Sequence, residues 1–64
     1  MKKLKKGDLT NIKGLNNQQL YFTGEFSNMS YDGLPLVFLA RDLSNKLTYS
    51  PYSQQFLLEN GYTI

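Results

Sequence analysis

Five tyrosines are the side chains in this 64-residue chain best suited to binding another molecule. A tyrosine brings a large, rigid contact area at low entropic cost, so exposed tyrosines suit a protein interface or the stacking of bases. In a small domain they can equally serve as a lid over the core. We expect Tyr21 on the solvent side of a strand and Tyr31 in a loop. The candidate protein-binding residues are Tyr21, Tyr31, Tyr49 and Tyr52.

A second candidate group lies in the first six residues, which carry four of the seven basic side chains: Lys2, Lys3, Lys5 and Lys6. Such lysines can neutralise phosphates, which adds salt-sensitive affinity for nucleic acid without reading its sequence. The other residues hold three basic against five acidic side chains, and hence a net charge of −2. We expect residues 1–6 to form a flexible basic tail, either a mobile solubilising terminus or a weak nucleic-acid contact. Deleting this tail should then leave the fold intact.

Side chains that carry enzyme chemistry are scarce. The chain has no histidine and no cysteine, which removes the commonest general base, the commonest metal ligand and the thiol nucleophile. Its five carboxylates are scattered singly, and its glycines lack the spacing of a phosphate-binding loop. The sequence therefore favours a protein that is not an enzyme and that uses neither a metal ion nor a cofactor.

Length and composition indicate one small folded domain over residues 7–64. Folding at this size buries only roughly 60% of the surface of the unfolded chain, so the core must be thin. A hydrophobic content of 41% argues against disorder. No apolar run is long enough for a signal peptide or a membrane span, and the lack of cysteine gives no support for secretion. We therefore expect a cytoplasmic protein.

Alternating apolar residues predict the strands that must position the candidate side chains. The alternation is clearest where Leu20, Phe22 and Phe26 share one face of a strand. Residues 36–40 are apolar on both faces, which indicates either a central strand or a strand wrapped inside a barrel, with one face covered by a helix or a partner. We expect strands at 7–13, 20–27, 35–43, 46–50 and 62–64, and a core that includes Phe22, Phe38 and Phe56.

Two local patterns refine this prediction. In the first strand we favour Thr10 and Ile12 facing inward with Leu9 partly exposed, the alternative being a bulge between them. A serine followed by a proline at 50–51 is a good helix start, and the Asn-Gly pair at 60–61 is a good helix end. A helical turn or short helix is therefore expected within 51–60.

Two short motifs, Lys6-Gly7-Asp8 and Thr23-Gly24-Glu25-Phe26, accompany this order of elements. Together they resemble the opening turn and the bent second strand of the SH3-like small β-barrels, a group that includes KOW-type and Tudor-like modules. The resemblance implies a mainly β fold, a five-stranded SH3-like barrel with a short helix before the last strand. Small proteins of bacterial viruses and prophages often have such barrels. The chain lacks the tryptophan and the Ala-Leu-Tyr-Asp-Tyr run of SH3 domains that hold proline-rich peptides, so this activity is not implied.

These observations favour a non-enzymatic module that binds another protein, a host protein if the gene is viral. The alternative is a barrel that binds nucleic acid through the basic tail and the exposed tyrosines. The negative charge of residues 7–64 disfavours the second function and does not oppose the first. We expect a monomer or a homodimer that does not act on membranes.

Overall fold

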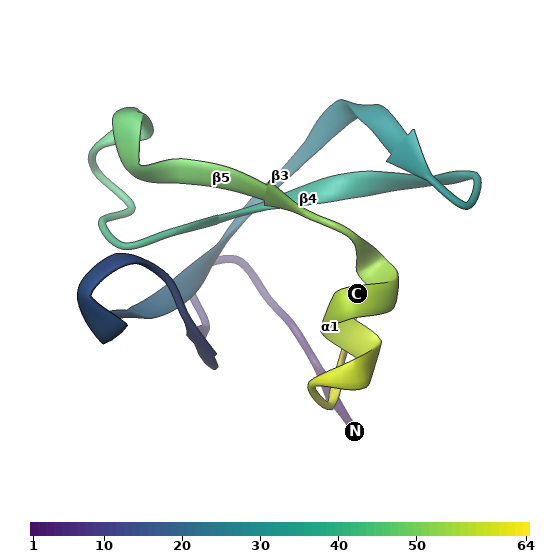
Figure 1. Ribbon diagram of the computed structural model, residues 1–64, viewed down its shortest axis with the longest axis horizontal. Coiled ribbons are helices and arrows are strands. Elements are labelled where there is room, and N and C mark those ends of the chain that lie inside the picture. The colour runs from purple at the N-terminus through teal and green to yellow at the C-terminus, as the bar shows by residue number, and fades with distance from the viewer.

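The computed structural model describes residues 1–64 and shows a mainly β protein built on one curled antiparallel sheet (Figure 1). The strand order in this sheet is β2 (Leu9–Lys13), β3 (Gln19–Tyr31), β4 (Leu34–Ala40) and β5 (Tyr49–Tyr52). The other elements are two 3-10 turns, η1 (Leu15–Asn17) and η2 (Lys46–Thr48), the helix α1 (Gln54–Glu59), and the strands β1 (Lys2–Lys3) and β6 (Tyr62–Thr63), which pair in parallel. The predicted mainly β fold, with a short helix before the last strand, is confirmed. The last strand pairs with β1 and does not join the four-stranded sheet.

The curl of the sheet comes from β3, whose pairing with β4 shifts register on both sides of Phe26. Gly24 lies in the first of these irregular stretches with a φ of 80°, a conformation that side chains disfavour. A Cβ atom at this position would also stand 2.9 Å from the Cβ of Lys6, which crosses the strand there. The bend therefore requires glycine for two reasons, and it turns the sheet into a half-barrel.

The core fills the concave side of this half-barrel. Leu20 and Phe22 enter it from β3, and Val37 and Leu39 enter it from β4. Its remaining members come from four other elements or their flanks: Leu4, Ile12, Leu57 and Tyr62. Each of these residues is at most 9% exposed, so nearly every element of this short chain contributes one or two side chains to a single cluster.

The first strand of the sheet follows the favoured pattern, with Thr10 and Ile12 buried and Leu9 44% exposed. A register shift between Leu9 and Lys13 also occurs, so the inward pattern and the irregularity coexist. The Thr10 hydroxyl donates to the Leu20 carbonyl at 2.8 Å and accepts from the Ile12 N–H at 3.1 Å. This buried threonine is therefore satisfied within the irregular stretch.

The helix begins later than predicted. Ser53 is the N-cap and its hydroxyl accepts from the Phe56 N–H at 3.1 Å, whereas Ser50 and Pro51 belong to β5. Both serines suit an N-cap, and a proline is tolerated on an edge strand, so the local pattern permitted either start. The later start turns Leu57 into the core and leaves Phe56, which was expected there, 38% exposed.

The prediction of a flexible tail at residues 1–6 is wrong. The Lys2 N–H donates to the Gly61 carbonyl at 3.0 Å, and the Leu4 N–H donates to the Thr63 carbonyl at 2.8 Å. Leu4 is only 4% exposed because it enters the core. The segment is thus held by β6, and the first strand of the sheet starts at Leu9 rather than at residue 7. The structure has no helix long and apolar enough to cross a membrane.

We expect Leu4→Ala to lower the free energy of unfolding by about 2–5 kcal/mol, because it leaves a cavity in the core. The matched control is Leu47→Ala, since Leu47 is 94% exposed and its loss should change stability by no more than about 0.5 kcal/mol. Chemical denaturation measures both values. Deletion of residues 1–6 should likewise destabilise the protein, and an unchanged melting temperature of the truncated chain would restore the flexible-tail model.

The two faces of β4 should respond differently to truncation. Leu39 is fully buried on the inner face, so Leu39→Ala should cost about 2–5 kcal/mol. Phe38 is only half-buried, and Phe38→Ala should cost about 1–2 kcal/mol despite the larger side chain that is removed. Thermal melts of the two variants test this order, and a larger loss for Phe38→Ala would place Phe38 in the core.

Candidate functional site

One face of the sheet is left uncovered. In β4 the side chains of Val37 and Leu39 point into the core, so those of Leu36 and Phe38 point to the opposite, convex side. Figure 1 shows α1 and both chain ends together on the other side of the β3–β4–β5 sheet. Leu36 and Phe38 are only half-buried. Phe38, predicted in the core, is therefore corrected to this outer face, because a strand that is apolar on both sides gives no signal for which side is buried.

Strand register brings three of the four candidate tyrosines to this face. Ala40 on β4 lies opposite Tyr21 on β3 and opposite Tyr49 on β5, so these side chains form a row across the sheet. Near the β3–β4 turn, Tyr31 lies opposite Leu34, which shares the outer side of β4 with Phe38. We call this surface the outer aromatic face; it comprises Tyr21, Tyr31, Leu34, Leu36, Phe38 and Tyr49.

The middle of the outer aromatic face is held in place by several contacts. The ring centres of Phe38 and Tyr49 lie 6.4 Å apart, and the Tyr49 hydroxyl donates to the Leu43 carbonyl at 2.8 Å. The ammonium group of Lys46 lies 5.9 Å from the centre of the Tyr49 ring and 3.4 Å from a carboxylate oxygen of Glu25. Tyr31 and Leu34 are the exposed end of the face, at 56% and 48%. The face therefore combines a fixed centre with an open end.

The fourth candidate tyrosine lies elsewhere. Tyr52 is opposite Val37, which places it on the inner side of the sheet, and it packs against the core. Its ring stacks on that of Phe56 with 5.6 Å between the centres. Tyr62, which the sequence did not single out, is buried, and its hydroxyl accepts from the Asn11 N–H at 2.8 Å. The candidate set thus divides into three tyrosines on one face and one on the other.

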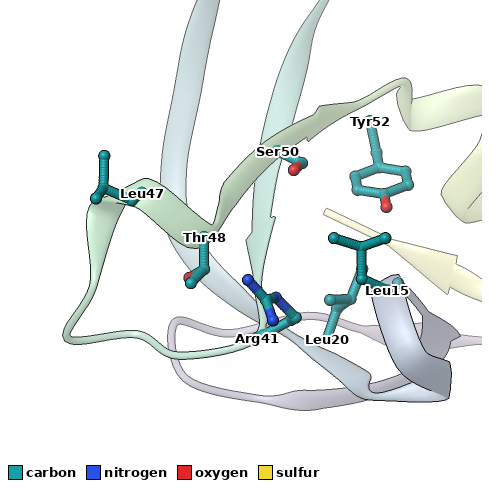
Figure 2. Close-up of a pocket in the computed structure, with 8 residues that line it drawn as sticks. Leu15, Leu20, Arg41, Leu47, Thr48, Ser50 and Tyr52 are labelled. Carbon is teal, nitrogen blue, oxygen red and sulfur yellow. The ribbon is translucent and has the colours of Figure 1, made fainter.

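A small cavity of about 170 Å³ opens where the two edges of the sheet approach each other without pairing (Figure 2). We call it the seam pocket. Its walls come from the end of β2 and η1 on one side and from η2 and β5 on the other. The lining residues are Gly14, Leu15, Leu20, Arg41, Leu47, Thr48, Ser50 and Tyr52. Sequence reasoning found only Tyr52 among them, because the two short turns meet only in the folded chain.

The loop between β4 and β5 is closed by its own polar side chains. The Thr48 hydroxyl contacts the carbonyls of Asp42 and Asn45 at 2.9 and 2.7 Å, and the Asn45 side chain accepts from the Leu47 N–H at 3.0 Å. The Asp42 carboxylate accepts from the hydroxyl and the N–H of Ser44. These bonds from Ser44, the hydroxyl above all, lower the pKa of Asp42. One wall of the seam pocket is therefore a well-bonded turn.

The four candidate lysines do not converge on one patch. Lys2 lies 3.9 Å from Asp8, and the Lys2 side chain is exposed while that of Asp8 is partly exposed, so this ion pair is weak. Lys2 and Lys3 are successive residues of a strand and point to opposite sides of it. Lys6 lays its aliphatic stem against Gly24.

The structure brings no three Asp, Glu, His or Cys side chains close enough to hold a metal ion.

Comparison with protein-family models, with curated proteins and with solved structures finds no match. The function must therefore be inferred from the surfaces of the molecule. Two of them stand out: the outer aromatic face on the convex side of the sheet, and the seam pocket between its two edges.

The Asp42 carboxyl should titrate below its ordinary pKa in the folded protein, because Ser44 donates two hydrogen bonds to the carboxylate. A lowered pKa means that this group stabilises the fold above its unfolded pKa, and that the contribution is lost as pH falls through the folded pKa. Carboxyl NMR shifts measure the titration. Ser44→Ala should raise the pKa towards the ordinary value, and an unchanged pKa in this variant would show that the hydroxyl contributes nothing.

Proposed function

We propose that this chain is a non-enzymatic protein-binding module that docks on its partner through the outer aromatic face. The observation that carries the proposal is the row of aromatic and apolar side chains on the outer side of the sheet: Tyr21 and Tyr49 flank Ala40 next to Phe38, and Tyr31 lies opposite Leu34 at the far end of β4. Aromatic side chains dominate the energetics of protein interfaces, since they bury large areas with little loss of conformational freedom. An apolar sheet face of a small domain gains stability when a partner covers it.

The charge pattern around the face also fits a protein partner. The ion pair of Lys46 with Glu25 stands beside Tyr49, with the side chains largely exposed. An apolar centre with a polar, solvated border is the usual composition of a protein interface. A nucleic-acid surface would need several cations on the same face, and Lys46 is already paired with a carboxylate. The face therefore favours a protein over a nucleic acid.

Binding by side chains is favoured over binding by strand addition, because the free edge of β5 is interrupted. On β5, Pro51 has no N–H to offer to a further strand. A partner would thus gain little from extending the sheet.

The resemblance to the SH3-like small β-barrels supports a binding role of the same kind. On that resemblance we propose a module of a bacterial virus or prophage, whose partner would be a protein of the host. The curled sheet and the helix before the last strand agree with such a barrel. Fold alone does not fix function, so the proposal depends on the outer aromatic face.

The experiment has two stages. The mass in solution is measured first, because a homodimer would mean that a second copy covers the face. The tagged protein is then used to purify partners from bacterial lysate, with and without nuclease, and the recovered partner is titrated against the protein. We expect Tyr31→Ala and Leu34→Ala each to weaken binding by more than about 1 kcal/mol while the melting temperature stays within a few degrees.

Leu58→Ala is the matched control, since Leu58 is 44% exposed, Leu34 is 48% exposed, and α1 lies on the opposite side of the sheet from the outer aromatic face. It should bind like the unmodified protein. Normal binding by both Tyr31→Ala and Leu34→Ala would contradict the proposal. Recovery of material that disappears with nuclease would support the nucleic-acid alternative, in which Lys2, Lys3, Lys5 and Lys6 provide the phosphate contacts.

A further inference from the structure

The seam pocket holds a cation without an anionic partner. Arg41 as a whole is half-buried, and the one hydrogen bond of its guanidinium to the protein is a long, exposed contact of 3.4 Å to the Gln18 side-chain oxygen. The two ion pairs of the molecule join Lys2 to Asp8 and Lys46 to Glu25, so no carboxylate pairs with Arg41. A guanidinium has five donors in a fixed fork, a geometry that matches a carboxylate.

Two free hydroxyl groups line the same cavity. Ser50 and Tyr52 both face it from β5, and neither hydroxyl makes a hydrogen bond to the protein. Figure 2 shows the Tyr52 hydroxyl directed towards Leu15, with Ser50 beside it and Arg41 below. With the guanidinium, these groups offer donors from three side chains to one small space. An acceptor with two oxygens could therefore be bound from more than one side.

Three leucines form most of the remaining lining, and two of them are unusually exposed. Leu20, 3% exposed, is the buried part of the lining, whereas Leu15 is 71% and Leu47 is 94% exposed at its rims. Leu15 is followed by Asn16 and Asn17, both with φ close to 60°, so its turn is held in a left-handed conformation. Figure 2 shows Leu47 directed away from the cavity, so Leu15 is the exposed leucine placed to cover an apolar group that enters it.

The size of the pocket limits what it can hold. A volume of about 170 Å³ equals roughly five or six water molecules at about 30 Å³ each. Pockets for drug-sized ligands and cofactors usually measure about 300–1,000 Å³, so a nucleotide would not fit. One carboxylate and one branched aliphatic side chain would fit. Because β2 and β5 do not pair, the seam stays open and the remainder of a longer ligand can leave along it.

We propose that the seam pocket binds the C-terminal residue of a peptide whose last side chain is aliphatic. The terminal carboxylate pairs with the Arg41 guanidinium and accepts from the hydroxyls of Ser50 and Tyr52. The aliphatic side chain packs on Leu20 and is covered by Leu15. This site is separate from the outer aromatic face, because Ser50 and Tyr52 point to the inner side of the sheet. It therefore does not depend on the proposed function of that face.

The test uses a five-residue peptide that ends in leucine with a free carboxylate, and the same peptide with an amidated C-terminus. Backbone NMR shifts of the full 64-residue chain are followed during each titration. We expect the free acid to shift the amides of Leu20, Ser50 and Tyr52, and the amidated peptide to bind at least about tenfold more weakly. Equal binding of the two peptides, or no binding of either at millimolar concentration, would overturn the proposal.

Variants separate the site from general charge effects. Arg41→Gln should weaken binding of the free acid at least about tenfold, and Tyr52→Phe, which keeps the ring, should weaken it several-fold. Lys13→Gln is the matched control, since Lys13 is an exposed cation outside the pocket and its loss changes the net charge equally. This variant should bind the free acid as tightly as the unmodified protein does. If Lys13→Gln weakens binding as much as Arg41→Gln does, the effect is one of net charge and the proposed site is overturned.

Two further ligands test which part of the peptide the pocket recognises. N-acetyl-leucine carries the same carboxylate and side chain without the preceding chain, and an amidated peptide with an internal Leu-Asp pair carries an acid elsewhere. We expect both to bind more weakly than the free-acid peptide. If N-acetyl-leucine binds equally well, the site serves small carboxylates and not peptides. If the internal acid binds equally well, the pocket does not recognise a C-terminus. The melting temperature of each variant is measured to check that it folds. If Arg41→Gln fails to fold, Tyr52→Phe still tests the site.

Discussion

The structure depends on β4, a strand that is apolar on both faces but has only one face covered by other parts of the chain. β4 runs between β3 and β5 with Val37 and Leu39 on one side and Leu36 and Phe38 on the other. The chain has one short helix, and its Leu57 joins Val37 and Leu39 in the core. The first side of β4 is therefore fully buried while the second is not. A chain of this length cannot build a second layer, and the uncovered side becomes an apolar surface available for binding.

The short length of the chain also explains the arrangement of the two chain ends and of the sheet edges. The N-terminal segment is used to close the core, since Leu4 reaches the cluster that α1 and β6 enter from the other end of the sequence. No strand remains to pair with the outer part of β3 or with the free edge of β5. On β5 the free edge carries a proline, which has no N–H to offer to a further strand. The gap between the two edge strands, β2 and β5, remains as the seam pocket.

Local patterns in the sequence were sufficient where one face of a strand is polar. The alternation around Leu20 and Phe22, and the inward side chains of Thr10 and Ile12, are found as predicted because a period of two needs no knowledge of the fold. The same period could not decide the orientation of Phe38, since both sides of β4 are apolar. The helix start was ambiguous because Ser50 and Ser53 are both competent caps. The pairing of β1 with β6, and the meeting of η1 with β5 at the pocket, join residues far apart in sequence and leave no local signal. Of the candidate site, three tyrosines could be predicted, and Arg41 could not.

The most direct test of this account is the accessibility of successive side chains along β4 in the monomer. A soluble paramagnetic agent enhances the NMR relaxation of protons in proportion to their contact with solvent. The account predicts strong enhancement for Leu36 and the ring of Phe38, and little enhancement for Val37 and Leu39, at concentrations where the mass in solution is that of one chain. If Phe38 is as protected as Leu39 in the monomer, both faces of β4 are covered, and the central claim of an uncovered binding face is contradicted.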